Sequence, residues 1–219
     1  WVAGWSVGPG WAGWAAGGVS ASDQGATALR GPSAARTPAA GTLQFTRVCA
    51  QGGTATCGTS PGMGTNNVGK VDFTFDGTTF TLATPSGIAS TGGADGIIFA
   101  PNGHLLVAGQ QNKDVYEITT GGSLVTTGTA GVISDHLTIT PDGLHLMVGP
   151  TSSGGTGLGT VPIVSGGGLG GAGSACTVTG DDTSIASIAY DGAGPAYYTT
   201  SGPAGTGKLG PFTRSLSAG

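Results

Sequence analysis

Short apolar runs alternate along the middle of the chain with Asn-Gly and Asp-Gly pairs. Residues 95–109 (DGIIFAPNGHLLVAG) align without a gap with residues 135–149 (DHLTITPDGLHLMVG), and a third copy begins at residues 184–192 (SIASIAYDG). An Asn-Gly or Asp-Gly pair between two apolar runs indicates a β-hairpin, because both central residues of the favoured turn take a positive φ. Each copy therefore predicts two antiparallel strands.

A second type of hairpin recurs with a period of 44 residues. Residues 71–83 contain two apolar runs around Asp76-Gly77, and residues 115–127 contain two such runs around a Gly-Gly pair. Another 44 residues on, the run 159–164 occupies the same place. Two hairpins per period predict a repeating unit of four strands.

The composition favours an all-β chain. Of 219 residues, 46 are glycine and only 8% are charged. Glycine costs about 1 kcal/mol at each interior helix position, which argues against a helical bundle. The glycines have no three-residue period, which excludes collagen.

Four-stranded antiparallel units with a period of 40 to 50 residues are typical of β-propeller blades. Residues 42–214 resemble propellers of the NHL, YVTN and lactonase-like kind, and the strand-Pro-Asp-Gly-strand motif of residues 137–148 carries the resemblance. The expected fold is an all-β propeller with about four visible blades, the first and last incomplete. An irregular β-sandwich or a β-solenoid is the alternative, although solenoid repeats are usually shorter.

The predicted strands divide among four blades, of which the first and the last are incomplete. The first holds Leu43–Val48, Val71–Phe75 and Thr79–Ala83; the second spans 97–128, the third 137–179, and the fourth runs from Ile185 to 209–213. Propellers usually have four to eight blades. We therefore expect either an unusually small ring or a fragment of a larger propeller, and we favour the fragment. Open blade edges invite pairing with another chain, which predicts self-association.

Two regions are expected. Residues 1–41 form a Gly/Ala-rich extension that holds all four tryptophans, interpreted as loosely ordered, as a processing remnant or as an interface. Residues 42–219 form the propeller blades.

The loops that lead into the inner strands of a propeller gather around its central channel. The repeat places Asp95, Asp135 and Ser184 at one such position, with His136 next to Asp135. The resemblance implies a ligand-binding rim of Asp95, Asp135, His136 and Ser184, and a catalytic role for Asp135 and His136 if the chain is an enzyme, because histidine transfers protons near neutral pH. In the alternative interpretation Asp135 caps backbone amides and His136 only packs.

No metal or other cofactor is expected. Calcium usually binds six to eight oxygen ligands. Glu117 is the only glutamate in the chain, and it lies in the middle of a predicted strand. Asp95 and Asp135, with Asp181 or Asp182, would make a poor set for a divalent cation. The turn residue Asn102 is assigned no chemistry, and His104 and His145 are interpreted as strand side chains.

Cys49 and Cys57 enclose seven residues, and in an oxidising compartment we expect them to form a disulfide while Cys176 stays free. A reduced pair is the alternative. Low charge and abundant Thr and Gly favour an extracellular or periplasmic location.

The charge pattern excludes some partners. A net charge of −4 with seven scattered basic residues argues against nucleic acid, and no apolar run is long enough to predict a membrane span. Three functions remain: a secreted, non-catalytic scaffold that binds a protein or glycan partner, a lactonase- or lyase-like enzyme for small molecules, or a structural protein completed by strand exchange.

Overall fold

The described part of the chain consists of antiparallel sheets. The computed structural model describes residues 14–15, 38–47, 57, 59–110, 112–150, 157–177, 185–190, 196–200 and 209–212. Within these ranges every regular element is a β-strand. This confirms the all-β class predicted from the glycine content.

The strands of the described residues form four sheets, which we call blades 1 to 4 in chain order. Blade 1 contains β1 (Trp14–Ala15), β2 (Ala39–Arg47), β3 (Val68–Phe75), β4 (Phe80–Leu82) and β5 (Ser86–Ala89). Blade 2 contains β6 (Ile97–Phe99), β7 (Leu105–Ala108), β8 (Asp114–Ile118) and β9 (Leu124–Thr129). Blade 3 contains β10 (Ser134–Ile139), β11 (His145–Pro150), β12 (Gly157–Pro162) and β13 (Ser174–Thr177), and blade 4 contains β14 (Ile185–Tyr190), β15 (Ala196–Thr200) and β16 (Leu209–Phe212).

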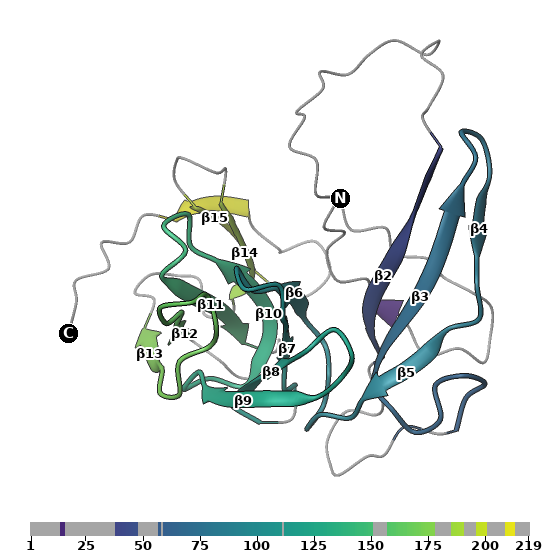
Figure 1. The fold of residues 1–219 in the computed structure, drawn as a ribbon. Helices are drawn as coiled ribbons and strands as arrows, with labels where there is room; N and C mark the ends of the chain where they lie inside the picture. The colour runs from purple at the N-terminus through teal and green to yellow at the C-terminus, as the bar shows by residue number, and fades with distance from the viewer. Residues whose placement is uncertain are drawn as a thin grey trace, which may run out of the picture.

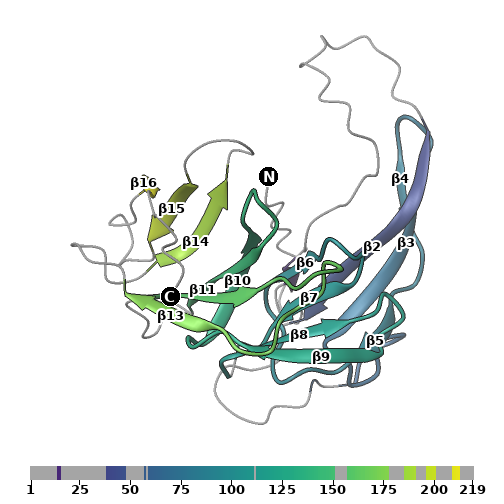
Figure 2. The same ribbon diagram turned by 60° about the vertical axis from the view of Figure 1, so that its left-hand side comes forward.

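The connections are those of a β-propeller. Blades 2 and 3 each place four consecutive strands side by side in chain order, all antiparallel. The second strand of one blade contacts the first strand of the next, in the pairs β2 with β6, β7 with β10 and β11 with β14. Figures 1 and 2 show blade 1 on the right, blade 2 in the middle, and blades 3 and 4 on the left, with blade 4 above blade 3.

The hairpin turns use the predicted glycines. Gly103 and Gly143, at equivalent places in blades 2 and 3, have φ values of 84° and 72°. Residues with a Cβ seldom adopt this left-handed region, so glycine at these two positions allows the turn.

The core lies between the blades. All four residues of β7 are buried, because neighbouring blades cover both faces of this strand. Leu105 and Val107 pack toward blade 1, whereas Leu106 belongs to the cluster shared with blade 3. We call the contact between blades 2 and 3 the seam.

Blade 1 differs from the prediction of three strands. The two-residue strand β1 pairs with β2, and β2 begins at Ala39 within the segment predicted as an extension. Two short strands share one edge of β3: β4 pairs with residues 73–75 of β3, and β5 pairs with residues 68–70. Pro85 lies between β4 and β5, and proline has no N–H with which to continue a ladder.

Candidate functional site

Asp95 and Asp135 meet where the inner strands of blades 2 and 3 begin. Asp95 lies two residues before β6, and Asp135 lies at an irregularity in the pairing of β10 with β11. Such bulges re-aim side chains next to functional sites. We call Asp95 and Asp135 the carboxyl pair.

Hydrogen bonds from three blades hold Asp95 in place. Its side-chain Oδ2 accepts a 2.9 Å hydrogen bond from Nε2 of Gln110, and its carbonyl oxygen accepts one from the hydroxyl of the buried Thr46. The amide N–H of Gly96 donates to the carbonyl oxygen of Asp135 at 2.9 Å. Residues of blades 1, 2 and 3 therefore fix the carboxyl pair.

The two carboxyl groups interact directly. Burial, a hydrogen bond with Asp135 and the charge of Asp135 together raise the pKa of Asp95 to about 7, against a smaller opposing effect of His136. Two carboxylates in contact cannot both ionise at low cost, so one of them holds a proton. The pair can thus donate and accept hydrogen bonds near neutral pH.

One oxygen of the pair lacks a partner. Asp135 Oδ1 is buried, and no group in the described residues hydrogen-bonds it. A buried acceptor without a partner costs free energy, so this oxygen offers a place for a donor group.

The predicted rim is brought together in part. Asp95 and Asp135 come together, and the exposed His136 lies near enough to act on the charge of Asp95. No hydrogen bond joins Asp135 to His136 in the described residues, so the structure does not place Asp135 as an orienting group for that imidazole. Ser184 lies outside the described residues.

The site contains residues that the sequence did not indicate. Gln110, in the turn between β7 and β8, and Thr46, in β2, hold Asp95, and nothing in their local sequence marks them. No group of three or more potential metal ligands (His, Cys, Asp or Glu) occurs in the residues that the structure describes. Asp181 and Asp182 lie outside them.

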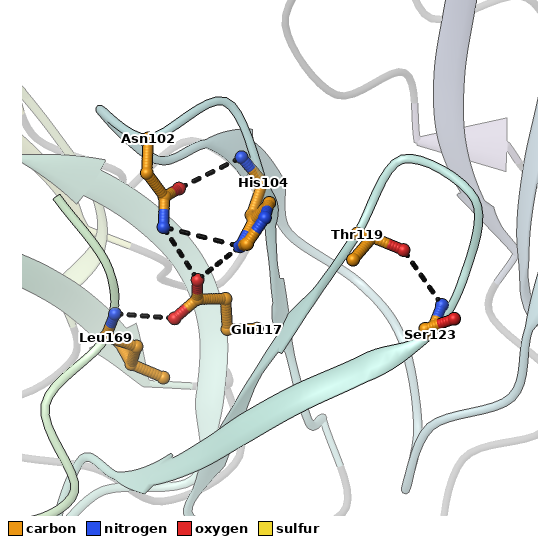
Figure 3. A network of polar contacts seen from close by, with 6 residues as sticks. All are labelled: Asn102, His104, Glu117, Thr119, Ser123 and Leu169. Atoms are coloured by element: carbon orange, nitrogen blue, oxygen red, sulfur yellow. Dashed lines mark hydrogen bonds and ion pairs between the residues drawn. The ribbon is translucent and has the colours of Figure 1, made fainter. Parts of the chain in front are cut away.

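A second polar cluster occupies the turn end of blade 2 (Figure 3). Oε1 of Glu117 accepts hydrogen bonds from Nδ2 of Asn102 at 2.8 Å and from Nδ1 of His104 at 2.6 Å. Its Oε2 accepts a 2.6 Å bond from the amide N–H of Leu169 in blade 3. The sequence predicts a turn residue at Asn102 and a strand side chain at His104, and it gives no signal for this network, because the network forms only after the strands pair.

The environment keeps Glu117 ionised. Its side chain is almost fully buried, and burial alone would raise its pKa. Hydrogen bonds from Leu169, Asn102 and His104, with the charge of His104, outweigh burial and lower the pKa below the ordinary glutamate value. Three donors on one carboxylate favour its charged form.

Cys57 is disulfide-bonded and buried. Cys49, the partner that the sequence predicts, lies outside the described residues, so the pairing itself stays a prediction. In the portion that the structure describes, no helix has the length and apolar character needed to cross a bilayer.

Comparisons with known proteins concern the fold. No protein-family model and no curated protein sequence matches the chain. Similar solved structures include a functionally unknown protein from Desulfotomaculum acetoxidans, at 15% identity, a TM-score of 0.45 and coverage of 78% of this chain and 51% of that one. Another is a streptogramin B lyase, at 12% identity, a TM-score of 0.43 and coverage of 78% and 51%.

A third similar structure is a gluconolactonase-type protein, at 18% identity, a TM-score of 0.38 and coverage of 73% of this chain and 52% of that one. The chain spans about half the length of the solved structures that it matches. Four consecutive antiparallel sheets, each contacting the next, give the described chain the architecture of β-propeller blades.

Proposed function

We propose that the chain is a secreted binding scaffold whose carboxyl pair anchors a hydroxyl-rich ligand, such as a glycan. The observation that carries the proposal is the contact of Asp95 with Asp135 at the start of the inner strands, with Oδ1 of Asp135 unpartnered. A hydroxyl group both donates and accepts hydrogen bonds, and a carboxyl pair with one proton offers both functions.

The surroundings of the pair support binding of a neutral ligand. His136 beside the pair is exposed, and the side chain of Ile133, two residues before Asp135, is 42% exposed. Sugar rings present hydroxyl groups at their edge and C–H groups on their faces, so an apolar side chain next to a polar anchor suits them. The disulfide at Cys57 supports an oxidising compartment.

Glycan-array screening, followed by calorimetry on the glycans that bind, tests the proposal. We expect Asp135→Asn to weaken binding by about tenfold or more, because the amide presents a donor where the ligand meets an acceptor. Asp72→Asn is the matched control, since Asp72 is exposed in blade 1 and hydrogen-bonds Thr42. Failure of every glycan to bind, or equal binding by both variants, would refute the glycan proposal.

A second candidate function is a small-molecule enzyme of the lactonase- or lyase-like kind. It is favoured by the pKa of Asp95, which burial and Asp135 raise to about 7, because a general acid or base works best near the operating pH. His136 would then be the second proton-transfer group, from its exposed position beside the pair.

Turnover of lactones and of elimination substrates separates the two functions. For an enzyme, His136→Ala should lower kcat by about 10² to 10⁴ and leave the fold intact. For a binding scaffold, no substrate turns over and the same variant changes affinity only locally.

A further inference from the structure

The Glu117 cluster connects two blades. Glu117 lies in β8 of blade 2, whereas Leu169 lies in the connection between β12 and β13 of blade 3. The 2.6 Å bond from the Leu169 amide to Oε2 of Glu117 therefore crosses the seam (Figure 3). The Leu169 side chain is buried in the apolar cluster shared by both blades.

The charge in this cluster departs from the repeat. Glu117 pairs with Leu106 across the ladder, and Val161 pairs with Leu146 at the equivalent place in blade 3. Blade 3 thus builds the same position with an apolar residue. A buried ionised group in place of a packed apolar side chain brings little net stability, which points to a role other than packing.

Among the described residues, few other groups face the carboxylate of Glu117. His104 comes from the turn between β6 and β7 and is the titratable group that acts on Glu117. β7 and β9 present Leu106 and Thr126 opposite Glu117. The connection 165–170 from blade 3 contains only Ser, Gly and Leu, so it brings no charge.

We propose that Glu117, Asn102 and His104 form an acid-released latch, which holds the connection 165–170 of blade 3 against blade 2 while Glu117 is ionised. Three N–H donors converge on the two carboxylate oxygens. A proton added to Glu117 takes one lone pair of the carboxyl group and removes its negative charge, so the bonds from all three donors weaken, because hydrogen bonds to an ionised acceptor are stronger than those to a neutral one. The Leu169 bond is the one that joins the blades.

The direction of the pH effect follows from the lowered pKa of Glu117. A carboxyl group whose pKa is lower in the folded state stabilises that state above its unfolded pKa of about 4.3, and this contribution is lost as the pH falls through the folded value. The latch is therefore closed at neutral pH and opens in acid, at a pH below the ordinary pKa of a glutamate.

Amide hydrogen exchange at Leu169, measured from about pH 7 to about pH 2.5 and corrected for the intrinsic rate, tests the latch. In the unmodified chain we expect the protection of this amide to fall by about tenfold or more over the acidic end of the range. The amide of Val107, in the buried strand β7, reports any global unfolding.

Two variants separate a latch from a merely structural contact. Glu117→Gln keeps an acceptor oxygen and does not titrate, so its Leu169 protection should show no acidic loss. Glu117→Val, which copies Val161 of blade 3, should lack the protection at every pH while Val107 stays protected. Constant protection of Leu169 in the unmodified chain, or full protection in Glu117→Val, would overturn the latch.

Discussion

The backbone N–H of Gly96 donates to the carbonyl oxygen of Asp135 at 2.9 Å, which joins the starts of two inner strands across the seam. A Cβ atom on Gly96 would lie 2.2 Å from that carbonyl oxygen. Gly96→Ala must therefore push the two strands apart, and we expect it to lower the free energy of unfolding by about 1–3 kcal/mol.

Urea denaturation of Gly96→Ala measures this effect. Gly121→Ala is the control, because the nearest atom to its added Cβ would be Thr119 Oγ1 at 3.7 Å, an ordinary contact. Equal stability of the two variants would show that the approach of Gly96 to Asp135 does not constrain the seam.

The raised pKa of Asp95 makes stability depend on pH. Folding raises this pKa from an ordinary value of about 4 to about 7, so the folded state favours the protonated group. The contribution of Asp95 to the free energy of unfolding is complete below about pH 4 and is lost as the pH rises through about 7. Between about pH 4 and about pH 8, the free energy of unfolding of Asp95→Asn, measured by denaturation, should fall less than that of the unmodified chain. Parallel pH profiles would contradict the shared proton.

A negative charge at Asn102 should disrupt the Glu117 cluster. Nδ2 of Asn102 lies 2.8 Å from Oε1 of Glu117, so Asn102→Asp places a second carboxylate there. We expect it to be more destabilising than Asn102→Ala at neutral pH, because like charges in contact repel, and the difference should shrink near pH 4, where carboxyl groups take up protons. Thermal unfolding at the two pH values measures this. A lower thermal stability of Asn102→Ala than of Asn102→Asp at neutral pH would argue against an ionised Glu117.

The disulfide at Cys57 should leave one free thiol. If Cys57 pairs with Cys49 as the sequence predicts, thiol titration of the unfolded, unreduced chain yields one reactive group, Cys176. Reduction should then cost about 2 kcal/mol of stability, as expected for a short loop. Three reactive thiols would refute the bridge.

Blade 1 presents apolar side chains on its outer hairpin. Phe80 and Leu82 of β4 are 59% and 58% exposed, and the ring of Phe80 stacks on that of Phe73 with centroids 5.0 Å apart. β4 is the outermost strand of this sheet in the described chain, and such edges promote association. We expect Phe80→Lys to reduce self-association in analytical ultracentrifugation and to change stability less than Leu106→Ala in the core. Unchanged association of Phe80→Lys would exclude β4 as the surface through which the chains associate.

The blade pattern was predictable because it depends on local rules. Pro-Asn-Gly and Pro-Asp-Gly turns between apolar runs are properties of neighbouring residues, and they located the hairpins of blades 2 and 3. The repeat alignment also brought Asp95 and Asp135 to one place, as the structure has them.

The remaining features depend on contacts between distant residues. Thr46 and Asp95 belong to different blades, and their hydrogen bond joins residues 49 positions apart in the sequence. The bond from Leu169 to Glu117 joins residues 52 positions apart. Neither has a local signal, because each depends on where one blade lies against the next. The double pairing of β3 was missed for the same reason.

The carboxyl pair consists of one repeat position used twice. Asp95 and Asp135 align in the sequence, and each comes from the beginning of the first strand of its blade. An aspartate at this repeat position in two adjacent blades therefore meets its own equivalent, and the glycine at position 96 allows the close approach. The raised pKa of Asp95 is thus a property of two adjacent blades, because it needs both the burial between them and the second aspartate, and a single blade supplies neither.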